Sequence, residues 1–203
     1  MSQPAALGFR AHSGWAVVVA VTASPVNGVV LARRRIEIAY AGIPGSKQPF
    51  HAAAALDDLS AAEVLIHQRR ESSTELATRA VREVIAELAK AGHAVACSSI
   101  ILAAGRPLPN LAAILKSHAL IHTAEGEFFR DVLQRANEDC GLPVMKLRAR
   151  DVWDRGSETF SVPSAALQKQ IVQVGRAIGP PWREDHQLAS LAAWIALAEI
   201  VVR

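Results

Sequence analysis

The sequence predicts an α/β protein in which helices cover a mixed sheet. Two observations predict this class: an opening pair of strand-like segments joined by a turn, and a later alternation of strand-like and helical segments. The hairpin requires antiparallel strands, whereas the alternation favours parallel ones. Of the 203 residues, 51% are hydrophobic, so the chain can bury a substantial core. We expect residues 1–203 to form a single domain.

The opening hairpin is expected from residue 14 onward. Residues 14–23 (GWAVVVAVTA) form a continuous apolar run rich in β-branched side chains, which is typical of a buried strand. Asn27 and Gly28 then give the strongest short-range signal for a hairpin turn. Residues 29–40 alternate only in part because three arginines interrupt them. This favours a strand near the sheet edge, where charges discourage pairing with another sheet.

The later alternation begins with the clearest helix in the chain. Ser73 is expected to cap its start and Gly92 to end it. Residues 52–72, before this helix, fit one or two short helices or a third strand, and the pattern leaves both open. The remaining expected segments, in chain order, are a strand over 94–105, a helix over 111–140, a strand over 143–153, and helical sequence from 165 that is interrupted at 179–185 and ends at 202.

Composition and charge limit the classes of partner. The apolar runs fall well short of the about 20 residues that cross a bilayer, so no membrane partner is expected. The first residues, MSQPAALGFRAHSG, contain no positive region followed by an apolar one, so we expect no signal peptide and a cytoplasmic location. The net charge of +3 permits nucleic acid or phosphate partners without requiring them. Three basic runs (ARRR, HQRR and KLRAR) are candidates for nucleic-acid contact, although aromatic residues make up 5% and form no stacking run.

Three passages carry a resemblance to a known family: residues 8–21 (GFRAHSGWAVVVAV), residues 100–136, and residues 183–198 (REDHQLASLAAWIALA). They are similar, respectively, to the first strand, to the fourth strand with its active-site loop and following helix, and to the final helix of the ribonuclease H-like superfamily. The likeness is to the RuvC-type Holliday-junction resolvases in particular, and it covers most of residues 8–200. It implies a ribonuclease H-like mixed sheet, with an antiparallel hairpin and then parallel strands, flanked by helices.

The chemistry of the resembled family needs acidic residues in the first strand, at the end of the fourth strand and at the start of the last helix. Those carboxylates hold two magnesium ions. The first place falls near Arg10 or His12 and the second near residues 104–106, and neither contains an acid. Only the last place is filled, by Glu184 and Asp185. We therefore expect a degenerate member that does not perform two-magnesium cleavage but binds an anionic partner, either nucleic acid or a phosphorylated small molecule.

The resemblance also places several polar residues together at one end of the sheet, beyond the strand ends, where open α/β sheets have their sites. Arg10 and Arg106 are the candidate anion-binding residues, because Arg106 begins a loop that leads into a helix. His12, Asp185 and His186 are candidate catalytic groups for general acid–base chemistry.

A second constellation does not depend on the resemblance. His118, His122 and Glu125 are spaced i, i+4 and i+7, so on a helix they share one face. Two imidazoles and a carboxylate are ligands of the type that hold zinc, iron or manganese, so this face is a candidate divalent-metal site, with Glu125 also a candidate catalytic group. The alternative is that both imidazoles make ordinary hydrogen bonds and that Glu125 pairs with Arg130.

Two rival functions follow from these residues. One is a metal-dependent hydrolase acting on phosphate esters, built from His12, His118, His122, Glu125 and Asp185. The other is a non-catalytic interaction protein that forms a homodimer through its apolar final helix.

Overall fold

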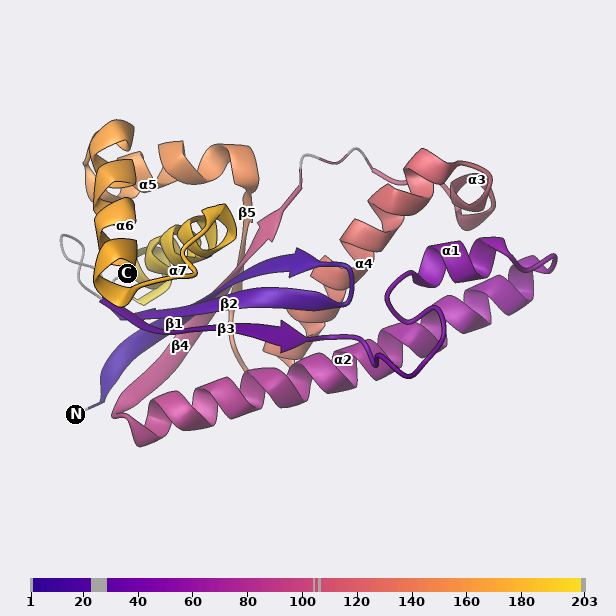
Figure 1. Ribbon diagram of the computed structural model, residues 1–203, viewed down its shortest axis with the longest axis horizontal. Coiled ribbons are helices and arrows are strands. Elements are labelled where there is room, and N and C mark those ends of the chain that lie inside the picture. Colours follow the sequence, from indigo (N-terminus) through magenta and orange to yellow (C-terminus); the bar gives the residue numbers. More distant parts are fainter. Residues whose placement is uncertain (1, 23–28, 104, 106, 202–203) are drawn as a thin grey trace.

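A computed structural model describes residues 2–22, 29–103, 105 and 107–201, and it contains a five-stranded sheet with helices on both faces (Figure 1). The strands are β1 (Gln3–His12), β2 (Trp15–Thr22), β3 (Val29–Glu37), β4 (His93–Leu102) and β5 (Val144–Arg148). The helices are α1 (Pro49–Ala54), α2 (Leu59–Lys90), α3 (Leu111–Leu115), α4 (His118–Glu138), α5 (Val152–Phe160), α6 (Ser164–Ile178) and α7 (Glu184–Val201).

The order of strands across the sheet is β3-β2-β1-β4-β5. β1 and β3 both pair antiparallel with β2, whereas β4 is parallel to β1 and β5 is parallel to β4. The predicted mixed sheet, an antiparallel hairpin followed by parallel strands with flanking helices, is therefore confirmed. β3 lies at an edge, as its three arginines predicted.

The segment pattern did not predict the first strand of the sheet, although the resemblance placed Arg10 and His12 on a first strand. Residues 14–23 were predicted to open the sheet, but they form the second strand, because Gln3–His12 precedes them and pairs with them. The turn between the two strands falls at Ser13 and Gly14, where Gly14 has a φ of 81°, a conformation that favours glycine. The Asn27-Gly28 turn lies outside the described residues.

Residues 52–72 contain the end of α1 and the first part of α2, joined by residues 55–58, so the helical alternative that the sequence left open is the correct one. α2 begins at Leu59, where the Asp58 carboxylate accepts hydrogen bonds from the N–H groups of Ser60 and Ala61. The prediction that Ser73 caps a helix is wrong, because Ser73 is buried in the middle of this 32-residue helix. Only the N–H groups in the first turn of a helix lack partners within the helix, and the Asp58 side chain accepts from two of them. Ser73 lies too far along the helix to do so.

Two further boundaries differ from prediction. The helix expected over residues 111–140 is divided, because Ser117 accepts from the Leu120 N–H group and starts α4 after the short α3. The strand expected over residues 143–153 ends at Arg148, and α5 begins at Val152. Val152, the first residue of α5, is buried in the same core as the residues of α7.

Alternating side chains of the sheet build two separate core layers. Leu7, Phe9 and Val18 pack against α1, α2 and α4, whereas Val17 and Val19 pack against α5, α6 and α7. This alternation is the ordinary consequence of a strand with both faces covered. It places α4 and α7 on opposite faces of the sheet, a separation that decides where the candidate site residues can meet.

α7 is a buried helix and not an exposed apolar face. Every residue from 188 to 197 is buried, and a methyl group added at Gly8 of β1 would lie 1.8 Å from the carbonyl oxygen of Ala189. A helix that is apolar all round belongs in a core. The expectation that this helix pairs two subunits is therefore wrong for these residues, and the homodimer itself stays a prediction.

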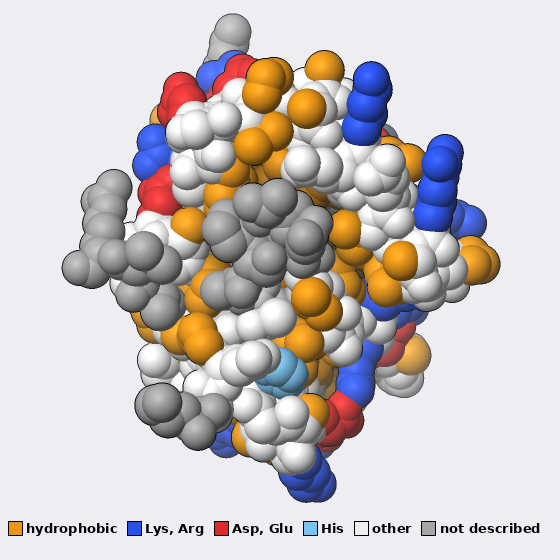
Figure 2. All heavy atoms as spheres, turned by 90° about the vertical axis from the view of Figure 1, so that its left-hand side faces the viewer, with side chains coloured by type: hydrophobic (Ala, Val, Ile, Leu, Met, Phe, Trp, Pro, Cys, Tyr) orange, Lys and Arg blue, Asp and Glu red, His pale blue; other side chains and the backbone are white. Residues whose placement is uncertain are grey.

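The outer face that carries α5 and α6 has apolar side chains scattered among polar ones, as Figure 2 shows. Val172 of α6 is 41% exposed. Isolated apolar side chains of this kind are normal on protein surfaces. None of the helices in the described part of the chain combines the length and the apolar character that crossing a bilayer requires.

Candidate functional site

Five side chains meet where β1 ends and α7 begins, and we call them the β1-end cluster: Arg10, His12, Trp15, Arg35 and Asp185. His12 Nε2 lies 3.0 Å from Asp185 Oδ2, and Arg10 Nε lies 3.4 Å from Asp185 Oδ1. Both oxygens of this carboxylate are thus paired with cationic or hydrogen-donating groups of the central strand. Asp185 also lies in the first turn of α7, where the helix dipole favours a negative charge.

Trp15 connects the two halves of this cluster. It is the register partner of His12 across the β1–β2 hairpin, and the two rings stack with centroids 4.0 Å apart and planes 9° apart. The Arg35 guanidinium of β3 lies 4.2 Å from the centre of the Trp15 ring, a cation–π contact, and its Nε donates to Glu37 at 2.8 Å. The cluster therefore extends from the central strand to the edge of the sheet.

The arginines of β3 alternate between the two faces of the sheet. Arg33 donates to the carbonyl oxygens of residues 178–181, between α6 and α7, at 2.5–3.1 Å. Arg34 forms an ion pair with Glu87 of α2. With the contacts of Arg35 to Trp15 and Glu37, all three arginines in the ARRR run therefore make contacts within the molecule.

His186 lies beside Asp185 but has a different role in the fold. Its Nδ1 accepts a hydrogen bond from the Arg183 N–H group at 3.2 Å, so the ring caps the start of α7. Burial lowers the pKa of His186, and the nearby Arg33 lowers it further, while Asp185 opposes both. These contacts assign His186 to holding the loop before α7.

The second predicted anion-binding residue, Arg106, lies outside the described residues. The same region contains an acid that sequence reasoning did not place there. A methyl group added at Gly105 would lie 3.1 Å from Glu127 Oε1, so this carboxylate of α4 packs beside the end of β4. Arg130 holds it, with Nε 3.2 Å from Oε2 and Nη2 2.8 Å from Oε1.

Three imidazoles form a second group, which we call the histidine cluster: His51, His118 and His122. One nitrogen of each can lie within 4.8 Å of the other two. His118 and His122 are exposed on α4, whereas His51 comes from α1 and is half-buried. The predicted pair is therefore brought together, and a third imidazole joins it.

Glu125 turns toward His51. It is 3% exposed, and its Oε1 accepts from the His51 backbone N–H group at 3.2 Å and lies 2.9 Å from His51 Nδ1. The predicted pairing with Arg130 is not what the structure has, because Arg130 contacts Glu127. The sequence did not indicate His51 because residues 41–51 contain two prolines and two glycines, a composition typical of a loop. Pro49, a preferred first residue of a helix, was the signal for α1.

The β1-end cluster and the histidine cluster are separate. Asp185 begins α7 on one face of the sheet, whereas the histidines belong to α1 and α4 on the other. In Figure 1, α1 and the end of α4 next to α3 lie to the right of the sheet, whereas α7 overlaps its left part. The five residues proposed for a single hydrolase site are thus divided between two places.

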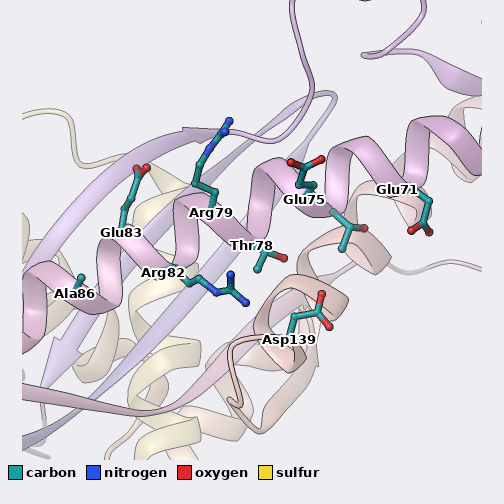
Figure 3. Close-up of a pocket in the computed structure, with 9 residues that line it drawn as sticks. Glu71, Glu75, Thr78, Arg79, Arg82, Glu83, Ala86 and Asp139 are labelled. Atoms are coloured by element: carbon teal, nitrogen blue, oxygen red, sulfur yellow. The ribbon is translucent and has the colours of Figure 1, made fainter.

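A surface groove of about 700 Å³ runs along α2 and the end of α4 (Figure 3). Its charged lining has four carboxylates and two guanidinium groups: Glu71, Glu75, Glu83, Asp139, Arg79 and Arg82. No predicted site residue lines it. An excess of carboxylates does not favour an anionic ligand, so we do not assign the groove a place in anion binding.

No protein-family model matches the chain, and no curated protein matches it. Solved structures do. A structure of T. thermophilus RuvC in complex with a Holliday junction substrate aligns with a TM-score of 0.55 and 8% identity, covering 98% of this chain and 95% of that one. A second structure of Thermus thermophilus RuvC aligns with a TM-score of 0.54 and 10% identity, covering 98% and 96%. The chain therefore has a RuvC-like, ribonuclease H-like fold.

Proposed function

We propose that this protein binds nucleic acid on a RuvC-like scaffold and does not cleave phosphodiesters with two magnesium ions. The observation that carries the proposal is the pairing of Asp185 with Arg10 and His12, at 3.4 and 3.0 Å. The resemblance to RuvC-type resolvases expects an acidic residue on the first strand. In this chain that strand presents a guanidinium and an imidazole to Asp185 instead. Both oxygens of the Asp185 carboxylate therefore already have partners within the fold.

The residues at the strand ends do not fit a pair of magnesium ions. Mg²⁺ prefers near-octahedral oxygen ligands and binds through carboxylates and water. Both oxygens of Asp185 contact Arg10 or His12, and both oxygens of Glu127 contact Arg130. Moving either carboxylate onto a metal would place a guanidinium beside a dication, which Coulomb repulsion opposes. This arrangement supports the binding of an anion rather than metal-assisted hydrolysis.

Arg10 and Arg35 are the side chains that we assign to the phosphate backbone. The Arg10 side chain is 29% exposed and that of Arg35 is 55% exposed, so both guanidinium groups are accessible to a ligand. Guanidinium groups match phosphate geometry and position a protein on nucleic acid. Arg33 and Arg34 of the same run are held by the loop before α7 and by Glu87. These two use both terminal nitrogens in those bonds, whereas Arg10 and Arg35 contact Asp185 and Glu37 through Nε. A phosphate contact by Arg33 or Arg34 would therefore break bonds within the fold.

Branched DNA is the ligand that we propose to test first, because the similar RuvC structure contains a Holliday junction. Fluorescence anisotropy of a labelled four-way junction, with a linear duplex of the same length for comparison, measures binding between about 50 and 200 mM salt. We expect affinity to fall steeply with salt, and we expect Arg10→Ala and Arg35→Ala each to reduce the slope of log K against log salt by about 0.9. Arg79→Ala removes the same charge from an exposed position on α2, outside the three basic runs, and should leave the slope unchanged.

Each outcome of this experiment bears on the proposal. Absence of binding at the lowest salt, or binding without salt dependence, would contradict it. Binding of ATP or inorganic phosphate without binding of any DNA would favour the phosphorylated small molecule instead. An equal loss in Arg79→Ala would show that net charge alone, and not the β1-end cluster, determines affinity.

A further inference from the structure

We infer that the histidine cluster binds Zn²⁺ through one nitrogen each of His51, His118 and His122, and that Glu125 positions His51 for this role. The site lies on the opposite face of the sheet from the β1-end cluster. The inference therefore stands apart from the proposed nucleic-acid binding, and either one can fail without the other.

The three imidazoles converge from two separate segments of the chain. His118 is the first residue of α4 and His122 lies one turn later, so their rings are 4.4 Å apart. His51 of α1 lies across from both, with ring centroids at 5.3 Å from His118 and 4.8 Å from His122. Helix spacing accounts for the first pair, whereas only the packing of α1 on α4 brings in the third ring.

Their separation is within reach of zinc coordination. A tetrahedral Zn²⁺ with Zn–N bonds of about 2.0–2.1 Å has its nitrogen ligands about 3.4 Å apart. The ligand atoms of the cluster lie within 4.8 Å of one another. His118 and His122 are exposed, so rotation about their side-chain bonds can close the remaining gap without disturbing the core.

Glu125 fixes the orientation of His51. Its buried Oε1 lies 2.9 Å from His51 Nδ1, so that nitrogen carries the proton and Nε2 keeps the lone pair that a metal needs. A carboxylate behind a ligating imidazole is the usual support of a histidine–zinc site. Phe50 and Phe128, neighbours of these residues in sequence, pack edge to face at 6.3 Å and join α1 to α4 at this point.

The donor set also selects the class of metal. Three imidazole nitrogens suit zinc and other borderline transition metals, whereas Mg²⁺ and Ca²⁺ require oxygen ligands. Three protein ligands leave a fourth position open for water or a substrate, which is the pattern of a catalytic rather than a structural zinc site. The competing account is that the rings only pack edge to face, with interplanar angles of 65–86°.

Metal binding by the chelator-treated full chain tests the inference. Titration calorimetry measures Zn²⁺ affinity, and visible absorption of the Co²⁺ form reports on tetrahedral nitrogen ligands. We expect one Zn²⁺ per chain, and we expect His118→Ala, His122→Ala and His51→Ala each to lower affinity at least tenfold. His67→Ala is the matched control, since His67 is 73% exposed on α2 and outside the cluster.

Glu125→Gln separates positioning from structure. The amide oxygen still accepts from His51, so the fold is retained, but the negative charge is lost. We expect Zn²⁺ affinity to fall about 10- to 100-fold while thermal unfolding of the metal-free protein changes little. If Glu125→Gln or His51→Ala does not fold, the exposed His118→Ala and His122→Ala variants still decide the question. Two results would overturn the inference: no visible absorption in the Co²⁺ form, or a loss of Zn²⁺ affinity in His67→Ala equal to that in the cluster variants. The three imidazoles would then only pack edge to face.

Discussion

His12, at the end of the central strand, donates a hydrogen bond to Asp185, at the start of the last helix, over 3.0 Å. The contact joins residues 173 positions apart in sequence, and Arg10 reinforces it from the same strand. These contacts hold the first turn of α7 against the end of β1. They also place the Arg10 guanidinium beside the negative charge of Asp185. This pairing is the feature on which the proposed function depends.

Arg33→Ala should destabilise the protein. Its guanidinium donates to four carbonyl oxygens of residues 178–181, which fixes the loop that leads into α7. Hydrogen bonds to a charged group contribute about 1.5–3 kcal/mol, so we expect a loss in that range by urea denaturation. Arg150→Ala, whose side chain is 63% exposed, should change the free energy of unfolding by no more than about 0.5 kcal/mol. An equal loss of unfolding free energy in the two variants would refute the role of Arg33 in fixing the loop before α7.

Gly8→Ala tests the close approach of α7 to β1. The added methyl group would lie 1.8 Å from the Ala189 carbonyl oxygen, so the helix must move away from the sheet. Overpacking of a core costs about 1–3 kcal/mol, which a shift of the denaturation midpoint measures. Gly42→Ala is the control, because no atom lies within 4 Å of the added methyl group there. A Gly8 variant as stable as the control would contradict this packing.

His186 makes stability depend on pH. Its pKa in the folded protein lies below the ordinary value of about 6.5, because burial and Arg33 disfavour the charged ring. The unfolded chain therefore takes up a proton at a higher pH than the folded one. The stability contributed by neutral His186 is full above about pH 6.5 and is lost as pH falls through the folded pKa. Unfolding free energies measured across this window should fall less steeply in His186→Gln, and an unchanged slope would exclude the effect.

The two cysteines should differ in reactivity. Burial raises the pKa of the Cys97 thiol to about 12, and the side chain is fully buried in the sheet. Cys140, at the end of α4, is only partly buried. Alkylation at about pH 8 followed by peptide mass analysis should modify Cys140 first, because the thiolate is the reactive form. Modification of Cys97 at a similar rate would indicate that β4 opens far more readily than a core strand should.

Much of the fold could be predicted because it depends on local pattern. Apolar runs such as residues 14–23 indicate strands, and the order of the segments was enough to predict a mixed sheet covered by helices. The segment pattern missed β1 because its N-terminal half, QPAAL, contains a proline and two alanines, which carry a weak strand signal although Ala5 and Ala6 are fully buried. The division between α3 and α4 depends on a single serine cap, which is a weak signal in a run of helix-forming residues.

The candidate sites could be predicted only in part, because they depend on packing between distant segments. Helical spacing was sufficient for His118 and His122, but His51 reaches them through the packing of α1 on α4. The placement of Glu127 beside Gly105 likewise requires α4 to lie over the end of β4. No periodicity within either segment contains that information.

The most direct test of the central claim is incubation of the protein–junction complex with Mg²⁺, followed by separation of the DNA strands on a denaturing gel. We predict a junction that is bound in a salt-dependent manner and remains uncut, because Asp185 stays paired with Arg10 and His12. Magnesium-dependent cleavage by the wild-type protein that is abolished in both Asp185→Asn and Glu127→Gln would contradict the account.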